Sequence, residues 1–378
     1  MLGVEVVRLT LSAAFVETRP ELAASMAPKS PTTIASTAMT QIGQAAARGG
    51  DPAPETLDRL QTLAAVAPLR PEPFLVQAAL AERAADYGKA TALLNEARRR
   101  DPRSPAARYL IADVSLRQGK VLEGLREMAV LSRLLPGTSV QLVPALSEYA
   151  RTPGAEKNLA SILAENRQLR NPLFEALAAD PDNAKLILAL AGSNFDSRIP
   201  DTRRWQVRLL DGLVARGDFD GAYALWRTFA RLREMPRPSL FNGDFRDSAP
   251  PPPFNWDFSD LKTSVAEPEN GRLRILYYGR ENAVLASQLL LLSPGSYRLE
   301  APVSGRVAPQ SLAWTLKCLG GTPLLTSWVG TSSNPADLFT VPASGCGAQK
   351  LELTGRAQDA PQDSDVHIGP VAIERAGG

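Results

Sequence analysis

The chain has 378 residues, of which 44% are hydrophobic and 22% are charged, and its formal net charge is +2 at pH 7. This length suits two domains, or a solenoid joined to one compact domain, and the composition excludes a largely disordered chain. The small net charge, without a run of basic residues interleaved with aromatic ones, argues against nucleic acid as a partner.

The beginning of the chain is apolar in places, but Glu5, Arg8 and Glu17 interrupt it, so no stretch reaches the ~20 apolar residues of a membrane span. It also lacks the order of a secretory signal, in which positive charge precedes an unbroken apolar core. Two interpretations stay open. The segment is an amphipathic helix that begins the helical region, or a signal or membrane anchor preceded Val4 and is missing. Membrane attachment is expected only in the second case.

An interval of 34 residues recurs in the N-terminal half of the chain. It links the prolines Pro68, Pro102 and Pro136, and the pairs Ala78 and Ala112, Ala90 and Gly124, and Leu94 and Met128. Small residues let two antiparallel helices approach closely, and a proline ends the second helix because it has no amide donor. We therefore predict helical hairpins over residues 71–136. In the first, one helix covers 72–84, a turn follows at 86–88, and a second helix ends at Arg100.

These hairpins resemble tetratricopeptide repeats. The residues on consensus positions of that family are Phe74, Ala78, Ala81, Ala90, Leu94, Ala97, Pro102, Ala112, Gly119 and Pro136. The second repeat departs from the pattern at Gly124, where alanine is usual, and at Ser115, where an aromatic residue is usual. A further hairpin is predicted over 203–232, with Gly217 at its turn, whereas 137–200 has helical segments without a clear register.

The resemblance implies an α-helical solenoid over residues 1–236. Such arrays present an extended curved surface that suits a peptide or another protein, so a protein partner is expected there. The alternative is a spacer that holds the C-terminal domain at a distance.

Beyond Pro236 the helical period gives way to an alternation of period two. Runs such as GRLRILYYG (271–279), SYRLEA (296–301) and KLELTG (350–355) are separated by turn pairs such as Pro-Gly and Ser-Gly. This pattern is typical of an antiparallel β-sandwich of about eight strands. The predicted fold class is thus a multidomain α + β chain, with an α-solenoid followed by a β-sandwich at 239–378.

The start of the second domain carries a further resemblance. NGDF (242–245) is predicted to form its first strand and PPPP (250–253) a stiff loop. With FNWDF (254–258) and QLLLLSPGSY (288–297), this domain resembles the jelly-roll fold of carbohydrate-binding modules and their galactose-binding-like relatives.

The modules of that family bind sugars by stacking them on exposed aromatic side chains, so the resemblance implies a polysaccharide ligand. The candidate contacts are Trp328, Trp256, Tyr278 and Asn334, with Asn255 and Asp257 as further polar groups. Trp256 could instead be buried in the sandwich, and Tyr278 could pack under a loop. Trp314 alternates with Leu312 and Leu316 and is assigned to the core.

The only two cysteines, Cys318 and Cys346, both lie in the second domain. A pair confined to one small β-domain favours a disulfide, which would stabilise the fold by about 3–4 kcal/mol through loop closure. It would also indicate an oxidising compartment, such as the periplasm or cell envelope. The alternative is two free thiols in a cytosolic protein. The spacing fits no metal motif, and we expect no metal site.

Signals for catalysis are weak. The only histidine, His367, is predicted to point outward from a terminal strand, and no nucleophile motif, phosphate loop or dinucleotide fingerprint accompanies it. We therefore predict no catalytic residue and no cofactor, and no acidic cluster identifies a calcium site.

Three hypotheses follow. The first is a non-enzymatic binding protein of the bacterial cell envelope, in which the solenoid engages a protein and the jelly roll binds a glycan. Its resemblances are to accessory proteins of surface-polysaccharide systems. The second is a pure protein-interaction scaffold with a ligand-free sandwich, and the third is an enzyme that acts on polysaccharides.

Overall fold

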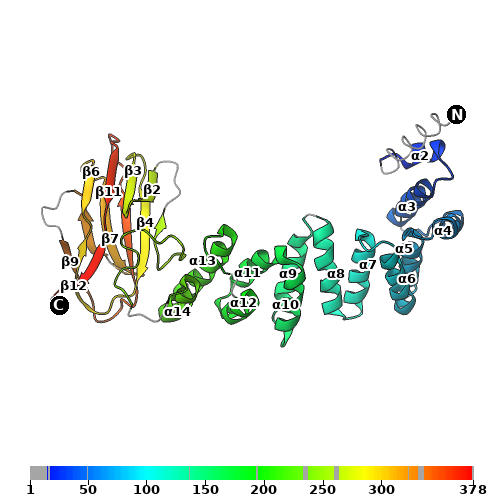
Figure 1. The fold of residues 1–378 in the computed structure, drawn as a ribbon, viewed down its shortest axis with the longest axis horizontal. Coiled ribbons are helices and arrows are strands. Elements are labelled where there is room, and N and C mark those ends of the chain that lie inside the picture. Colours follow the sequence, from blue (N-terminus) through cyan, green and yellow to red (C-terminus); the bar gives the residue numbers. More distant parts are fainter. Residues whose placement is uncertain are drawn as a thin grey trace. The chain divides into compact units, whose positions relative to one another are not determined.

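A computed structural model describes residue 15 and residues 18–48, 50–135, 137–192, 195–232, 237–258, 264–321, 323–330 and 336–376. Over these residues the chain is helical up to Ala230 and forms strands from Asp257 onward (Figure 1). The predicted fold class, an α-solenoid followed by an antiparallel β-sandwich, is confirmed.

The helices follow one another as antiparallel hairpins. In the described part of the chain they are α2 (Pro20–Met26), α3 (Pro31–Ala47), α4 (Pro54–Val66), α5 (Glu72–Arg83), α6 (Tyr87–Arg100), α7 (Pro105–Arg117), α8 (Val121–Leu134), α9 (Ser139–Tyr149), α10 (Ala155–Glu165), α11 (Arg170–Leu177), α12 (Ala184–Ala191), α13 (Pro200–Ala215) and α14 (Phe219–Ala230). None of the helices described is long and apolar enough to cross a membrane.

The chain divides into two compact units, Met1–Leu169 and Arg170–Gly378. The first unit holds α2 to α10, and the second holds α11 to α14 together with the strands. By compactness the last four helices therefore group with the sandwich, whereas our predicted domains, 1–236 and 239–378, follow the change in secondary structure.

The two predicted repeats are the hairpins α5–α6 and α7–α8. Asp86 begins α6 by accepting a hydrogen bond from the Lys89 amide at 3.0 Å. The residues at the two turns, Ala85 and Gly119, lie one repeat apart and both have positive φ, 57° and 73°. The structure explains why glycine replaces the usual alanine at position 124. A Cβ there would lie 2.7 Å from Cγ of Leu116 on the facing helix.

The consensus positions of the repeats mostly lie between the paired helices. Ala78, Ala81, Ala90, Leu94, Ala97 and Ala112 are buried. Phe74 is half-buried, with the Arg100 guanidinium 4.0 Å from its ring centroid, and Pro102 is exposed. Pro136 lies outside the described residues.

The strands form three antiparallel sheets. A five-stranded sheet has the order β1-β4-β10-β7-β8, a four-stranded sheet β2-β3-β11-β6, and a three-stranded sheet β12-β5-β9. Their bounds are β1 (Asp257–Phe258), β2 (Ser264–Glu269), β3 (Arg272–Tyr277), β4 (Ala283–Leu290), β5 (Gly295–Glu300), β6 (Val303–Arg306), β7 (Leu312–Cys318), β8 (Pro323–Trp328), β9 (Ala336–Val341), β10 (Gln349–Gly355), β11 (Ser364–Ile368) and β12 (Ala372–Arg375).

The core lies between the five-stranded sheet and the two smaller ones. Strand β7 contributes Leu312, Trp314 and Leu316 to this core, so the predicted alternation of that strand is confirmed. The intervening residues of β7 therefore lie on the outer face of the five-stranded sheet, together with their neighbours on β8 and β10.

The prediction that NGDF forms the first strand is wrong. Asn242 and Phe245 have φ of 53° and 57°, which a strand does not allow. The Asn242 side chain instead closes a loop, because it accepts a hydrogen bond from the Asp247 amide at 2.9 Å and donates one to the Asp247 carbonyl at 2.7 Å. The Gln288 amide holds this segment against β4 through both backbone groups of Phe241.

A cluster of aromatic rings joins α14 to the segment that precedes β1. Trp226 is fully buried, and its ring centroid lies 5.0 Å from that of Phe241 and 5.7 Å from that of Phe254. Its Nε1 donates a hydrogen bond of 2.7 Å to the Pro251 carbonyl. Tyr223 stacks on Trp226 and meets Phe254 edge-on. Residues 241–256 are thus neither a hinge nor a strand but a packed connection between helix and sandwich.

Candidate binding surfaces

The outer face of the five-stranded sheet carries a hollow of about 440 Å³. Its lining comes from strands β4, β7, β8 and β10 and the turns beside them: Asn282, Ala283, Val284, Ala313, Thr315, Thr326, Trp328, Thr354, Gly355 and Arg356. A sugar needs an aromatic face and hydrogen-bonding groups around it, and this lining offers both.

Strand register explains why the hollow lies here. Thr354 pairs with Val284 on one side and with Ala313 on the other, and Ala313 pairs with Trp328. These four residues form a row across four strands. Because Ala313 is small, the row leaves space beside the indole of Trp328.

Trp328 and Arg356 form one wall of the hollow. Trp328 is half-buried and ends strand β8. The Arg356 guanidinium carbon lies 5.9 Å from the centroid of the Trp328 ring, and the side chain is exposed. The hollow therefore combines an indole with one cation.

The next row of the same face contains a carboxylate, Glu352, that two lysines hold. Glu352 is 8% exposed, and its two oxygens lie 2.9 Å from Lys317 Nζ and 3.1 Å from Lys350 Nζ. Burial raises the pKa of Glu352, but the hydrogen bonds from the two lysines outweigh it, so the pKa lies below its ordinary value of 4.5. A general acid at neutral pH needs the opposite shift, so Glu352 is suited to holding the two lysines in place.

The structure brings one of the predicted glycan contacts, Trp328, to the hollow. Trp256 is 1% exposed and donates from Nε1 to the Asn242 carbonyl at 2.9 Å, so its proposed role as a sugar contact is wrong. Asn255 is likewise buried and hydrogen-bonded to backbone carbonyls. Tyr278 is half-buried and does not line the hollow, and Asn334 lies outside the described residues.

Sequence reasoning missed Thr315, Thr326 and Arg356. A signal for Thr315 was available, because it alternates with the inward-facing Leu312, Trp314 and Leu316 and must point to the outer face. Arg356 follows the end of a strand, and only the pairing of β10 with β7 brings it near Trp328.

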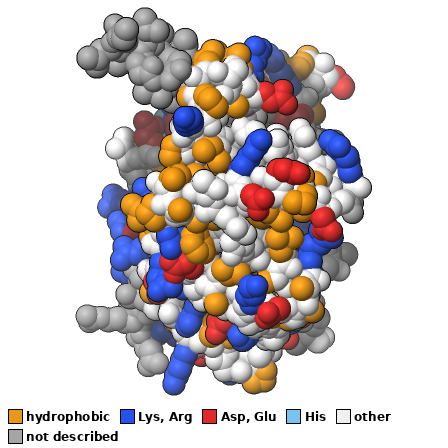
Figure 2. Space-filling model, turned by 90° about the vertical axis from the view of Figure 1, so that its right-hand side faces the viewer, with side chains coloured by type: hydrophobic (Ala, Val, Ile, Leu, Met, Phe, Trp, Pro, Cys, Tyr) orange, Lys and Arg blue, Asp and Glu red, His pale blue; other side chains and the backbone are white. Residues whose placement is uncertain are grey.

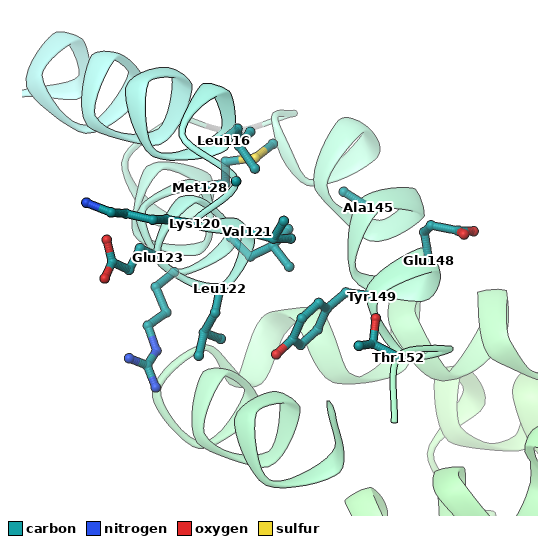
Figure 3. Close-up of a pocket in the computed structure, with 13 residues that line it drawn as sticks. Leu116, Lys120, Val121, Leu122, Glu123, Met128, Ala145, Glu148, Tyr149 and Thr152 are labelled. Carbon is teal, nitrogen blue, oxygen red and sulfur yellow. The ribbon is translucent and has the colours of Figure 1, made fainter. Parts of the chain in front are cut away.

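The first compact unit has a larger hollow, of about 790 Å³, on helices α7, α8 and α9. Its lining is Leu116, Gly119, Lys120, Val121, Leu122, Glu123, Leu125, Arg126, Met128, Ala145, Glu148, Tyr149 and Thr152. Figure 3 shows Val121 and Tyr149 on opposite sides of this space.

Two further hollows adjoin it, one on α7, α8 and α9 and one on α3, α5 and α7. The hollow of about 460 Å³ shares Leu116 and Met128 with the hollow of about 790 Å³. The hollow of about 200 Å³ shares Ala106 with the hollow of about 460 Å³. Large apolar side chains remain exposed along them, with Tyr109 at 61% and Leu116 at 39%. We call this continuous surface on α3, α5, α7, α8 and α9 the helical groove.

One face of the molecule is mixed in charge. On the face shown in Figure 2, Lys and Arg side chains lie among Asp and Glu side chains and hydrophobic ones. Such a pattern accords with the small net charge of the chain.

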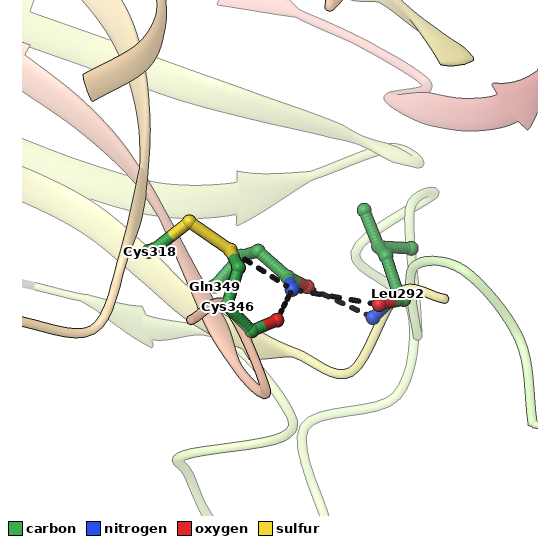
Figure 4. The surroundings of a disulfide bond; sticks show 4 residues. All are labelled: Leu292, Cys318, Cys346 and Gln349. Carbon is green, nitrogen blue, oxygen red and sulfur yellow. Dashed lines mark hydrogen bonds between the residues drawn. A yellow bond between two sulfur atoms is a disulfide. The ribbon is translucent and has the colours of Figure 1, made fainter. Parts of the chain in front are cut away.

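The predicted disulfide between Cys318 and Cys346 is present, with Cα atoms 5.1 Å apart. It joins the end of β7 to the turn before β10 (Figure 4). The buried Gln349 supports that turn, because its Nε2 donates to the Cys346 carbonyl at 2.8 Å while its Oε1 accepts from the Leu292 amide at 2.8 Å. Disulfide and amide together connect three chain segments at one end of the sandwich.

His367 lies beside Glu269, with 2.7 Å between Nε2 and the carboxylate, and both side chains are exposed to 39% and 44%. Its neighbours Val366 and Ile368 are fully buried, as the strand alternation predicts. Within the described residues, no group of three His, Cys, Asp or Glu side chains could hold a metal ion.

Comparison with known proteins finds similarity in solved structures alone. No protein-family model matches the chain, and no curated protein matches it. Yeast Tom70 is 12% identical with a TM-score of 0.30, covering 61% of this chain and 52% of that one. PilF of Pseudomonas aeruginosa is 14% identical with a TM-score of 0.27, covering 61% and 91%. TmCBM61, solved with β-1,4-galactotriose, is 18% identical with a TM-score of 0.26, covering 37% and 99%. Such values carry no conclusion about what this chain binds.

Proposed function

We propose that this chain is a non-enzymatic binding protein whose helical groove holds an extended segment of a partner protein. The observation that carries the proposal is the helical groove itself, three adjoining hollows that share Leu116, Met128 and Ala106. A contiguous apolar surface of this kind on a helical array is typical of protein-interaction sites.

The groove offers anchoring positions for apolar side chains and charged groups along its rim. Tyr109 and Leu116 are exposed apolar side chains on one face of α7, two helical turns apart. Lys120, Glu123 and Arg126 lie on the wall of the hollow of about 790 Å³. A segment with two or three apolar anchors would bury them here, and its polar groups would face the rim.

A random dodecapeptide library displayed on phage tests this proposal with the full chain. We expect enrichment of peptides with spaced apolar residues, and a loss of at least about tenfold in affinity for Tyr109→Asp, because a carboxylate in the groove must be desolvated by the peptide. Tyr109 is 61% exposed, so the substitution leaves the fold intact, which circular dichroism checks.

Val140→Asp is the matched control, because Val140 is 75% exposed on α9 but lines none of the three hollows. Peptides that bind the wild type and Tyr109→Asp equally well, or a library without any enrichment, would overturn the proposal.

A second candidate function belongs to the sandwich, which would bind a glycan at the Trp328 hollow. Pyranose rings stack on indoles, and the threonines around Trp328 can hydrogen-bond to sugar hydroxyls. With the disulfide, which favours an oxidising compartment, this suggests a protein of the periplasm or cell envelope that assists surface-polysaccharide assembly.

Affinity electrophoresis through gels that contain different polysaccharides tests this second function. We expect at least one polymer to retard the full chain and Trp328→Ala to abolish the retardation, because the stacking face is lost. Tyr278→Ala, a half-buried aromatic outside the hollow, should be retarded like the wild type. Without any such polymer, the sandwich would be the ligand-free cap of a scaffold.

A further inference from the structure

We propose that the Trp328 hollow selects sugars that carry an anionic substituent, and that Arg356 binds this substituent. The inference rests on the proposed glycan binding and adds the chemical class of the ligand. It concerns carboxylate and sulfate groups alike, since both present oxygens to a guanidinium.

The charge of the lining is one-sided. Among the residues that line the hollow, Arg356 is the one with a charged side chain. It is exposed, and no carboxylate of the described residues forms an ion pair with it. The other two cations on this face, Lys317 and Lys350, are both held by Glu352. Arg356 is therefore the cation that a bound anion would meet.

The backbone around Arg356 is fixed on both sides. Its own amide donates to the Ser311 carbonyl at 2.8 Å, and the amide of Ala357 donates to Asn282 Oδ1 at 2.9 Å. Ser311 is itself fully buried and hydrogen-bonded to Ser364 at 2.7 Å. The Arg356 backbone is thus held in place, and a ligand needs to order only the side chain that ends in the guanidinium.

The contact between Arg356 and Trp328 is long and weak. At 5.9 Å from the ring centroid, the guanidinium lies at the outer limit of a cation–π contact. The Arg100 guanidinium lies much closer to Phe74, at 4.0 Å. A pyranose that stacks on Trp328 would therefore lie directly beside the Arg356 guanidinium, which can exchange its weak contact with the indole for hydrogen bonds to an anionic ring substituent.

The test uses the full chain and matched pairs of polymers in affinity electrophoresis and calorimetry at low salt. The acidic probes are polygalacturonate, alginate and hyaluronate, each paired with its carboxyl-reduced form, and dextran sulfate is paired with dextran. We expect at least one acidic member to bind about tenfold to a hundredfold more tightly than its neutral partner, as for charge-assisted hydrogen bonds.

Three variants separate this selectivity from general attraction. Arg356→Gln should reduce the acidic-to-neutral preference to near one, and Arg356→Lys should restore part of it, because lysine keeps the charge but not the planar fork. Arg272→Gln, an exposed arginine on the four-stranded sheet, should leave the preference unchanged.

The outcomes distinguish the two proposals. Neutral polymers that bind through Trp328 as tightly as their acidic partners would overturn the charge selectivity and keep glycan binding. An acidic preference that survives in Arg356→Gln, or disappears in Arg272→Gln, would also overturn it. If no polymer of either kind binds the wild type, both proposals fall. A preference for dextran sulfate alone would identify the substituent as sulfate.

Discussion

Replacing Trp226 with alanine should lower the free energy of unfolding of the unit Arg170–Gly378 by about 3–5 kcal/mol. The indole is fully buried between α14 and the segment that precedes β1, so its removal leaves a cavity that Phe241 and Phe254 cannot fill. The Pro251 carbonyl also loses its donor at 2.7 Å and stays buried.

Urea unfolding followed by tryptophan fluorescence measures this loss selectively. All five tryptophans, Trp205, Trp226, Trp256, Trp314 and Trp328, belong to Arg170–Gly378, so the signal reports on that unit and four of them remain in the variant. Trp226→Phe should lose less, about 1–2 kcal/mol, because it keeps most of the ring but not the donor. A loss below about 1 kcal/mol in Trp226→Ala would show that the aromatic joint is not packed as described.

The double variant Cys318→Ala and Cys346→Ala should unfold with a free energy about 3–4 kcal/mol lower than the wild type. The bond closes a loop with a sequence separation of 28, and its loss lets the unfolded chain gain entropy. The turn that bears Cys346 also depends on Gln349, so we expect the end of β7 and the start of β10 to loosen first.

Dithiothreitol provides the control for this prediction. It should destabilise the wild type by a similar amount in the same fluorescence-detected urea titration and leave the double variant unchanged. Mass spectrometry after alkylation under non-reducing conditions should find no free thiol in the folded wild type. Two alkylated cysteines in the untreated protein would contradict the bond and, with it, the proposed oxidising compartment.

Local rules predicted the helical hairpins and most of the strands. The starts of α6 and α7 follow from the capping residues Asp86 and Ser104, and the turn after α7 follows from Gly119, all of which act within a few residues. The same rules did not predict the register of the helices over residues 137–200. Helix α9 contains Pro144, and α10 begins after Gly154, whose φ is 79°. Short strands such as β1, with two residues, have too little alternation to be predicted.

The candidate site was predicted less well than the fold, for reasons of tertiary packing. NGDF was predicted as a strand from the jelly-roll resemblance, but Asn, Gly and Asp favour turns, and the side-chain hydrogen bonds of Asn242 close a loop there. Trp256 became core because Phe245 and Trp314 enclose it. The nearness of Arg356 to Trp328 depends on the pairing of β10 with β7, two strands that are distant in sequence, and period-two alternation does not reveal this pairing.

The aromatic joint of Trp226 also decides where the sandwich can be cut for separate study. A fragment that begins at residue 239 would carry Phe241 and Phe254 without Trp226, which covers them. These two side chains would then form an exposed apolar patch that promotes association between copies of the fragment. One that begins at Arg170 keeps the helices that cover them. The fragment that begins at Arg170 is therefore the one that keeps the natural surface of the sandwich.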